Sequence, residues 1–388
     1  MADLKKKDRK YIANTYTRFD LELVKGNGSE LSDESGHQYI DMGAGIAVNT
    51  FGTNDEPWKR AVTEQMDMLG HTSNLYYTAP QVKLAQLLCK KTGMKKVFFC
   101  NSGAEANECA IKTARKYSSD KYGAGRHTIV TLCNSFHGRT ITTLSATGQD
   151  VFHKDFGPFT DGFIYAKPDD CNDMKDLLDG NRCAAIMIEL IQGEGGVYVL
   201  ERNYVDKVVN LAHERDILVI IDEVQTGNGR TGELYCYQRY GILPDIVTTA
   251  KGLGGGLPIG AVMFNERTEN VLGYGSHGST FGGNPIICAG AYSVIKRIDR
   301  KLMNNVLVKE KLIRDLLKDS QGVIGVTGMG LMLGVETVRP AKDVVKDCIK
   351  NGVLFLTAKN KVRMLPPLNI SSESIRKAIC VLKEAAAK

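Results

Sequence analysis

The stretch IVTTAKGLGGG at residues 246–256 places Lys251 directly after a β-branched run and directly before a glycine-rich loop. A second apolar run, ILVIIDE at residues 217–223, ends on the acidic pair Asp222 and Glu223. Continuous apolar runs of this length are typical of strands in a parallel sheet that is covered on both faces. A lysine and an aspartate at the ends of two such strands can lie on either side of one bound ring. That arrangement would hold an aldehyde cofactor as a Schiff base and keep its ring nitrogen protonated.

Apolar runs alternate with helical patterns between about residues 80 and 265. We expect strands at 97–100, 128–132, 184–190, 217–221, 246–250 and 259–264. A helix is expected to begin near Ala104, and an amphipathic helix is expected over 204–215. This alternation predicts an α/β fold with a mostly parallel sheet, whose ligands bind at the carboxyl ends of the strands.

The chain is expected to divide into three parts. Residues 46–286 form a large domain around the parallel sheet, and residues 287–388 form a smaller α+β domain that begins with one long helical stretch, 287–317. Residues 1–45 contain short strand-like pieces and are expected to pack with the small domain. The total of 388 residues is sufficient for two domains.

Bulk composition narrows the class of protein. A hydrophobic content of 43%, a charged content of 24% and a net charge of +6 are ordinary for a globular protein of this length. We do not expect nucleic-acid binding, because no basic stripe with interleaved aromatics is found in the sequence. We also expect neither a membrane span nor a secretory leader, because no apolar run of the required kind is found. The ten cysteines form no CxxC or Cys/His ligand cluster, and several stand in apolar runs. We therefore expect buried reduced thiols, no metal and a cytoplasmic location.

Two motifs follow predicted strands and leave two interpretations open. In NSGAEANE (101–108), Ser102 can cap a helix whose N-terminus binds a phosphate, or it can form an ordinary capping box with Glu105. In SFHGRT (135–140), Phe136 can stack on a flat ring and Arg139 can grip a carboxylate. For that motif taken alone, a core phenylalanine and a surface arginine are the favoured interpretation.

Three further loops carry polar groups. IQGEGG (191–196) and the residues after Asp222 follow apolar strands, and GSTFGGNP (278–285) can supply hydroxyl groups to an anion or simply form a glycine-rich turn. The spacing Gly273-x-Gly275-x-x-Gly278 matches a dinucleotide-binding fingerprint. It follows no clear strand and opens no helix, so the sequence context argues against nicotinamide binding.

Taken in order, these motifs resemble the class III, pyridoxal-phosphate-dependent aminotransferases, and most closely the acetylornithine aminotransferase branch. The resemblance extends to DEVQTGNGRTG (222–232), TTAKGLGGGLPIGA (248–261), VRMLPPL (362–368), NTYTRF (14–19) and GIAVN (45–49), and so covers nearly the whole chain. It implies a fold-type-I enzyme that uses pyridoxal 5'-phosphate. It also implies ping-pong transfer of an ω-amino group between N2-acetylornithine and 2-oxoglutarate, with glutamate as a product, in arginine biosynthesis.

The resemblance implies a role for each motif residue. Lys251 would bind the cofactor and move the substrate proton, and Asp222 would pair with the ring nitrogen. Arg139, with Ser279 nearby, would bind the substrate α-carboxylate, and Glu194 would face Arg363 as a switchable pair. The remaining cofactor contacts would come from Ser102, Gly103, Ala104, Phe136, Glu223, Val224, Gln225 and Thr280. Of these, Thr280 would reach the phosphate of a neighbouring subunit in a homodimer.

The chain departs from the family pattern at three places. Leu190 stands where proline is usual in the family, and Asn228 occupies a position that is more often apolar. Residues 52–57 (GTNDEP) differ from the stretch that the family usually has there, near the expected substrate entrance. None of these is expected to touch the cofactor chemistry. Ornithine, succinylornithine, 4-aminobutyrate and N-succinyldiaminopimelate aminotransferases stay open as alternatives. Glutamate-1-semialdehyde aminomutase and a non-catalytic binding protein also stay open.

Overall fold

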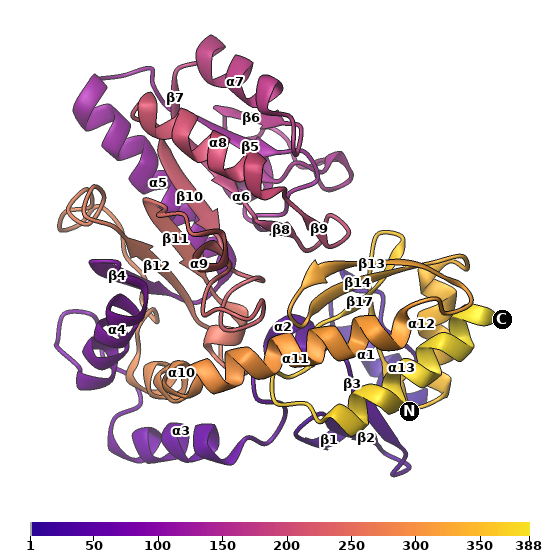
Figure 1. The fold of residues 1–388 in the computed structure, drawn as a ribbon. Coiled ribbons are helices and arrows are strands. Elements are labelled where there is room, and N and C mark those ends of the chain that lie inside the picture. Colours follow the sequence, from indigo (N-terminus) through magenta and orange to yellow (C-terminus); the bar gives the residue numbers. More distant parts are fainter. Residues whose placement is uncertain (1) are drawn as a thin grey trace.

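The computed structural model describes residues 2–388, so Met1 of the expected segment 1–45 lies outside the described residues. Figure 1 shows a large sheet flanked by helices, beside a second region that contains two smaller sheets. The large sheet has seven strands in the order β4-β12-β11-β10-β7-β5-β6. Their bounds are Lys96–Cys100 (β4), Thr128–Leu132 (β5), Phe163–Ala166 (β6), Cys183–Ile188 (β7), Leu218–Asp222 (β10), Ile246–Thr249 (β11) and Gly260–Phe264 (β12).

The large sheet is mostly parallel, as predicted. Strands β11, β10, β7, β5 and β6 pair in parallel, and only β12 runs antiparallel to its two neighbours, β11 and β4. Strand β6 was not predicted, because this edge strand has the partly exposed sequence FIYA rather than a continuous buried run. Five strands therefore place their carboxyl ends at the same edge as β4 and form one platform for a site.

Helices cover both faces of this sheet. On β7, Ala185 and Met187 belong to the cluster around α5 (Gly103–Tyr122), whereas Ile186 and Ile188 belong to the cluster that includes α8 (Arg202–Glu214). Side chains alternate along a strand, so a run that is buried on both faces must be apolar throughout. Figure 1 shows α5 and α8 on opposite sides of the sheet.

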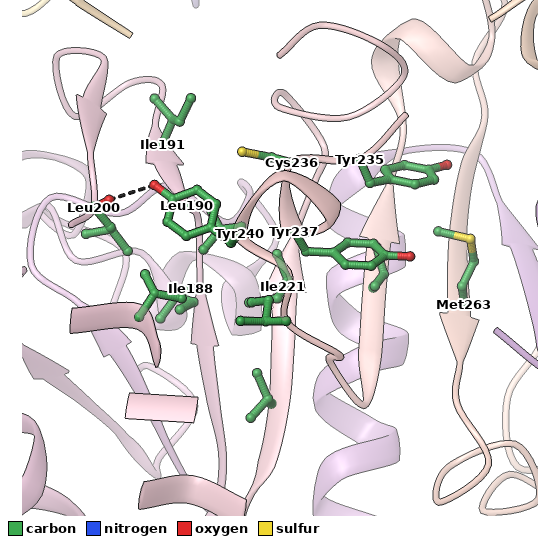
Figure 2. Packing of buried hydrophobic residues seen from close by; sticks show 14 of the residues in the cluster. Ile188, Leu190, Ile191, Leu200, Ile221, Tyr235, Cys236, Tyr237, Tyr240 and Met263 are labelled. Carbon is green, nitrogen blue, oxygen red and sulfur yellow. Dashed lines mark hydrogen bonds between the residues drawn. The ribbon is translucent and has the colours of Figure 1, made fainter. Parts of the chain in front are cut away.

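Aromatic side chains close the core near the strand ends. Figure 2 shows Tyr235, Tyr237 and Tyr240 packed beside Ile188, Ile221 and Met263. The Tyr240 hydroxyl donates to the Leu200 carbonyl at 2.6 Å, which gives this buried polar atom a partner. All three tyrosines come from α9 (Cys236–Tyr240) or the residue before it.

The second region contains two four-stranded sheets with the orders β13-β14-β17-β16 and β1-β2-β3-β15. Strand β3 pairs in parallel with β15, which joins the N-terminal segment to the C-terminal part of the chain. A separate buried cluster fills this region. The strands are Leu23–Asn27 (β1), Glu30–Asp33 (β2), Gln38–Asp41 (β3), Val323–Met329 (β13), Met332–Thr337 (β14), Val353–Leu354 (β15), Leu356–Ala358 (β16) and Lys361–Met364 (β17), and the helices are Arg300–Leu317 (α11), Ala341–Lys350 (α12) and Ser372–Ala387 (α13).

The predicted single helical stretch 287–317 is two helices, α10 (Pro285–Arg297) and α11. Ile298 leaves the helical conformation, and the Asp299 side chain accepts a hydrogen bond from the Leu302 amide at 2.8 Å. Aspartate favours the cap of a new helix because its carboxylate satisfies a free backbone N–H. The hydrophobic periodicity continues through this break and so does not reveal it.

The other elements are shorter or lie at the edges. They are the helices Ala2–Tyr11 (α1), Ala44–Ala47 (α2), Glu56–Met68 (α3), Ala79–Thr92 (α4), Ile141–Ala146 (α6) and Cys171–Gly180 (α7), the 3₁₀ turns Asp150–Phe152 (η1) and Lys251–Leu253 (η2), and the strands Ile191–Gln192 (β8) and Tyr198–Val199 (β9). In α2, Ala44, Ile46 and Ala47 all have positive φ, so this turn is left-handed. Among residues 2–388, no helix is both long and apolar enough to cross a membrane.

Candidate active site

A cavity of about 450 Å³ lies at the carboxyl ends of the large sheet. It brings together nine residues that the sequence analysis singled out: Lys251, Asp222, Ser102, Gly103, Ala104, Phe136, Arg139, Val224 and Gln225. The cavity is lined as well by residues to which the sequence analysis gave no role, and His137, Asn107 and Glu189 are polar members of this group. Residues from five separate loops therefore meet at one edge of the sheet.

Lys251 begins the 3₁₀ turn η2, which is separated from β11 by Ala250 alone. Its φ is +46°, a left-handed conformation that is strained for a residue with a side chain and costs about 1 kcal/mol or more. Burial lowers the pKa of the Lys251 ammonium, while the nearby carboxylates of Glu194, Asp222 and Glu189 oppose this shift. Among the described residues, Nζ makes no hydrogen bond or ion pair with another side chain.

The Asp222 carboxylate is held by three groups. Its Oδ2 accepts from Asn107 Nδ2 at 2.8 Å and pairs with His137 Nδ1 at 2.8 Å, and its Oδ1 accepts from the Val224 amide at 3.0 Å. All these groups are buried or nearly so, which strengthens hydrogen bonds to a charge. The orientation of Asp222 toward the cavity is therefore fixed by its surroundings.

The N-terminus of α5 opens into the cavity beside small residues. Ser102 caps the helix by accepting from the Glu105 amide at 3.1 Å, and the Glu105 carboxylate accepts from the Asn101 amide at 2.7 Å. A Cβ on Gly103 would lie 2.8 Å from Val224 Cγ1, so no larger residue fits there. The cap and an anion site are compatible, because the remaining N–H groups of the first turn still face outward.

Glu194 and Arg363 form an ion pair with an Oε1–Nη1 distance of 2.6 Å. Gln225 completes this cluster, since its Oε1 accepts from Arg363 at 3.2 Å and its Nε2 donates to Glu194 at 3.3 Å. Burial would raise the pKa of Glu194, but the charge of Arg363 and its hydrogen bond hold that pKa below the ordinary value. Arg363 comes from β17 of the second region, so this pair joins the two halves of the chain.

Arg139 is exposed at the rim of the cavity and rests on aromatic rings. Its guanidinium carbon lies 4.1 Å from the centroid of the Phe152 ring and 5.5 Å from that of Phe136. Phe136 and Phe152 pack edge to face with their centroids 5.8 Å apart. Stacking leaves the donors of the guanidinium free to bind a carboxylate in the plane of the group.

Five predicted site residues do not line the cavity. Two of them, Glu194 and Arg363, form the ion pair that contacts Gln225 of the cavity wall, and the other three are Glu223, Ser279 and Thr280. Glu223 is fully buried behind β10, where its carboxylate accepts from Thr226 Oγ1 at 2.6 Å and from the Tyr237 amide at 2.7 Å. The physical reason is alternation, because residues adjacent to one another at a strand end point to opposite faces. The Ser279 hydroxyl accepts from Asn101 Nδ2 at 3.1 Å, and Thr280 is exposed on the surface.

Glu189 is the principal polar residue that sequence reasoning missed. Its carboxylate accepts from the Phe136 amide at 2.8 Å and from the Gly193 amide at 3.3 Å, so it joins two of the cavity loops. Burial raises the pKa of Glu189 to about 7. Their positions in the sequence could have indicated these residues. His137 and Asn107 stand inside the motifs 135–140 and 101–108, and Glu189 lies two residues before the motif 191–196.

Other expected features lie outside the cavity. No residue of 52–57 lines it, and Asp55 instead pairs with Arg297 at 2.9 Å beside α10. The stretch 273–278 lies in turns between β12 and α10, away from the cavity. Of the cysteines in apolar runs, Cys100, Cys183 and Cys288 are buried free thiols, but Cys133 is only half-buried. The described part of the chain brings together no group of three or more side chains suited to a metal ion.

The fold and the cavity together define the class of protein. A mostly parallel seven-stranded sheet, with a lysine and an aspartate meeting at its carboxyl edge, is the arrangement of the fold-type-I, pyridoxal-phosphate-dependent enzymes. The chain belongs to the class-III aminotransferases, whose family model matches residues 11–386. This match confirms the predicted enzyme class.

Relatives and solved structures agree with this assignment. The chain is 50% identical over 383 residues to an acetylornithine aminotransferase from Haemophilus ducreyi, covering 98% of each protein. It is 46% identical to one from Aquifex aeolicus, covering 96% of this chain and 99% of the relative. Among solved structures, the ornithine aminotransferase of Toxoplasma gondii matches with a TM-score of 0.95 and 31% identity over 99% of this chain and 94% of that one. The N-acetylornithine aminotransferase of Stenotrophomonas maltophilia matches with a TM-score of 0.86 and 32% identity over 100% and 98%.

Proposed function

We propose that this aminotransferase moves the ω-amino group of N2-acetylornithine to 2-oxoglutarate in ping-pong fashion, as a step of arginine biosynthesis. The observation that carries the chemistry is the meeting of Lys251 and Asp222 in one cavity, with the Glu194–Arg363 pair bound to Gln225 of the cavity wall. Support for the substrate comes from relatives 41–50% identical over nearly the whole chain, which bear the name acetylornithine aminotransferase.

The residues of the cavity fit pyridoxal 5'-phosphate. Lys251 supplies an amine with a lowered pKa, and Asp222 supplies a fixed carboxylate. Glycine at residues 103 and 138 keeps one wall open, since a Cβ on Gly138 would lie 2.9 Å from Ala104 Cβ. When bound, the cofactor supplies an electron sink for the negative charge left as a substrate proton departs. The residues proposed to hold it are Lys251, Asp222, Val224, Gln225, Phe136, Ser102, Gly103 and Ala104, with Thr280 from a neighbouring subunit.

The chain's own groups then divide the work. Lys251 Nζ accepts the substrate proton and returns it, a task for which an amine pKa below its ordinary value is suited. Arg139 binds the α-carboxylate of the amino donor at the cavity rim. Arg363 binds the second carboxylate of 2-oxoglutarate once Glu194 releases it, and Glu194 neutralises Arg363 while the donor is present. One cavity thereby accepts two different substrates in turn.

We propose a homodimer, because Thr280 is exposed and lies outside its own cavity, where it is free to reach a neighbouring site. Ser279 is held by Asn101 at the edge of the α5 turn and is proposed to lie near the substrate carboxylate.

We also propose a cytoplasmic location. All ten cysteines are free thiols, as a reducing compartment favours.

A panel of amino donors tests the substrate. The purified enzyme should be yellow, should bleach on borohydride reduction, and should show its highest kcat/KM with N2-acetylornithine. Ornithine, succinylornithine, 4-aminobutyrate and N-succinyldiaminopimelate are the competing donors. Equal or better turnover of ornithine would favour the function named for the Toxoplasma structure. Failure of 2-oxoglutarate to regenerate the yellow form would favour an aminomutase.

The Lys251→Ala variant tests the site. It should keep the fold and lose transamination by several orders of magnitude, because both covalent attachment and proton transfer are removed. Appreciable turnover in this variant would overturn the role of Lys251. A colourless wild-type protein that does not bind pyridoxal phosphate would instead support a binding function.

A further inference from the structure

The residues before and after Lys251, Ala250 and Gly252, each have a carbonyl that accepts a hydrogen bond from a buried side chain. Asn228 Nδ2 donates to the Ala250 carbonyl at 3.1 Å, and Thr50 Oγ1 donates to the Gly252 carbonyl at 2.8 Å. Asn228 and Thr50 are 3% and 1% exposed, so water does not compete for these bonds. The two donors come from separate parts of the chain, one after β10 and one after the left-handed turn α2.

The packing around these bonds is close. A Cβ on Gly252 would lie 2.8 Å from Thr50 Oγ1 and 3.2 Å from Asn228 Cβ. The absence of a side chain at Gly252 therefore leaves room for both Thr50 and Asn228 beside the backbone. Between the two fixed carbonyls, Lys251 holds a φ of +46°. Strained conformations of this kind persist only where the surrounding contacts over-determine them.

Asn228 also has a local reason to be asparagine. Its own φ is +59°, a region that asparagine tolerates better than most residues, and its Nδ2 donates as well to Thr249 Oγ1 at 3.1 Å. Backbone preference alone would be satisfied by glycine. It does not explain a carboxamide directed at the carbonyl that precedes Lys251. Asn228, expected to lie away from the chemistry, thus contacts the backbone of the central residue.

We propose that Thr50 and Asn228 are positioning residues, a two-sided clamp that holds the Lys251 backbone in its left-handed conformation and keeps Nζ directed into the cavity. The inference rests on the proposed role of Lys251. Neither side chain touches the cofactor or substrate. Their effect passes through the peptide groups of Ala250 and Gly252.

The clamp is tested with Thr50→Val, which keeps the shape and removes the donor, and with Asn228→Gly, which keeps the positive φ and removes the carboxamide. Thr113→Val is the matched control for threonine, because Thr113 is a buried donor to the Cys109 carbonyl at 2.8 Å on α5. Asn54→Gly is the matched control for asparagine, since Asn54 has a φ of +60° and lies outside the cavity. Thr50→Ser restores the hydroxyl group.

The primary readout is the rate at which apoprotein attaches pyridoxal phosphate covalently. The Lys251 amine bonds to the aldehyde carbon with loss of water, and borohydride then delivers hydride to fix the bond for peptide mass analysis. We expect about tenfold slower attachment in both clamp variants, as for a small displacement of a reacting group. The value of kcat should fall about tenfold with KM for both substrates within twofold. Thr50→Ser and the two controls should stay near wild type.

Wild-type attachment rates in Thr50→Val and Asn228→Gly would overturn the clamp. So would a fall in thermal unfolding temperature with no slower attachment, because it would show a structural role only. Failure of the proposed function is separate: it would appear as wild-type protein carrying no label on Lys251, or as an active Lys251→Ala variant.

Discussion

At the scale of single residues, burial determines what each charged group does. Burial shifts three pKa values in the direction that favours the neutral form of the group. It lowers the pKa of Lys251 and raises the pKa values of Glu189 and Glu223. Glu194 shows the opposite behaviour, because Arg363 compensates for its burial. The sequence cannot distinguish these cases, since every one is a charged residue near a strand end.

Removing the partner of Arg363 should favour dicarboxylate binding. In the wild-type protein Glu194 binds the Arg363 guanidinium at 2.6 Å, so 2-oxoglutarate has to displace Glu194. In Glu194→Ala this competition is absent. We expect the KM for 2-oxoglutarate to fall about fivefold, corresponding to about 1 kcal/mol for a partly exposed ion pair. Steady-state kinetics of both half-reactions measure this. Glu201→Ala, which changes an exposed glutamate, is the control. An unchanged or raised KM would contradict the proposed switch.

Glu223 should make stability depend on pH without affecting the site. Burial raises its pKa to about 7 from an ordinary value of 4.5. The folded state therefore holds a proton that the unfolded state releases. This contribution to stability is complete below about pH 4.5 and is lost as the pH rises to about 7. In Glu223→Gln the difference in unfolding free energy between these pH values should shrink by on the order of 3 kcal/mol. Urea titrations at both pH values test this, and an unchanged pH dependence would contradict it.

At the scale of elements, a serine cap at a helix N-terminus can serve both folding and ligand binding. Helices α5 and α13 are each capped by a serine, Ser102 and Ser371, and each hydroxyl accepts a hydrogen bond from a backbone amide of the first turn. Only Ser102 lines the cavity. The capping interpretation of Ser102 is therefore correct in geometry, and the proposed phosphate contact adds to it.

Serine-to-alanine changes separate the two roles. Ser102→Ala and Ser371→Ala should each lower the unfolding free energy of the apoprotein by about 1 kcal/mol, the usual value of an N-cap. Only Ser102→Ala should also weaken pyridoxal phosphate binding, by about five- to tenfold for one lost hydrogen bond. Urea unfolding and absorbance titrations provide the two measurements. Equal cofactor affinity in both variants would remove Ser102 from the phosphate site.

At the scale of the whole molecule, the site depends on the joining of two regions. Buried Arg230, which follows β10, donates to the carbonyls of Leu331 and Pro366 at 3.2 and 2.5 Å. Strand β17 precedes Pro366 and carries Arg363. These bonds hold the second region against the large sheet. We propose the division 1–45, 46–286 and 287–388. Every residue that lines the cavity comes from the large domain, and Arg363 of the small domain reaches Gln225 at its wall.

Mixed dimers test whether Thr280 serves a neighbouring site. Lys251→Ala and Thr280→Glu homodimers should both be inactive, the second because a carboxylate would repel the phosphate. A dimer with one chain of each kind contains one site with both residues intact. Random mixing should therefore restore about a quarter of the wild-type activity, since half the dimers are mixed. No recovery would mean that Thr280 serves its own chain or that the chain acts alone.

Much of this protein is determined by local sequence. Continuous apolar runs predicted six strands of the large sheet, because burial on both faces requires apolar residues throughout. The order of motifs indicated the family, since each motif places a required group at a strand end. Lys251 and Asp222 could be identified in this way before any contact was known.

Only the tertiary structure decided the rest, because it depends on side-chain direction and on contacts between distant residues. Asp222 faces the cavity and Glu223 faces away, although the two are adjacent in the sequence. Asn228 and Thr50 meet the backbone on either side of Lys251, and no local pattern links them. The conformation of Lys251 itself is strained, so packing and not propensity sets it. The sequence by itself therefore determined which groups are present, and packing decided which of them meet.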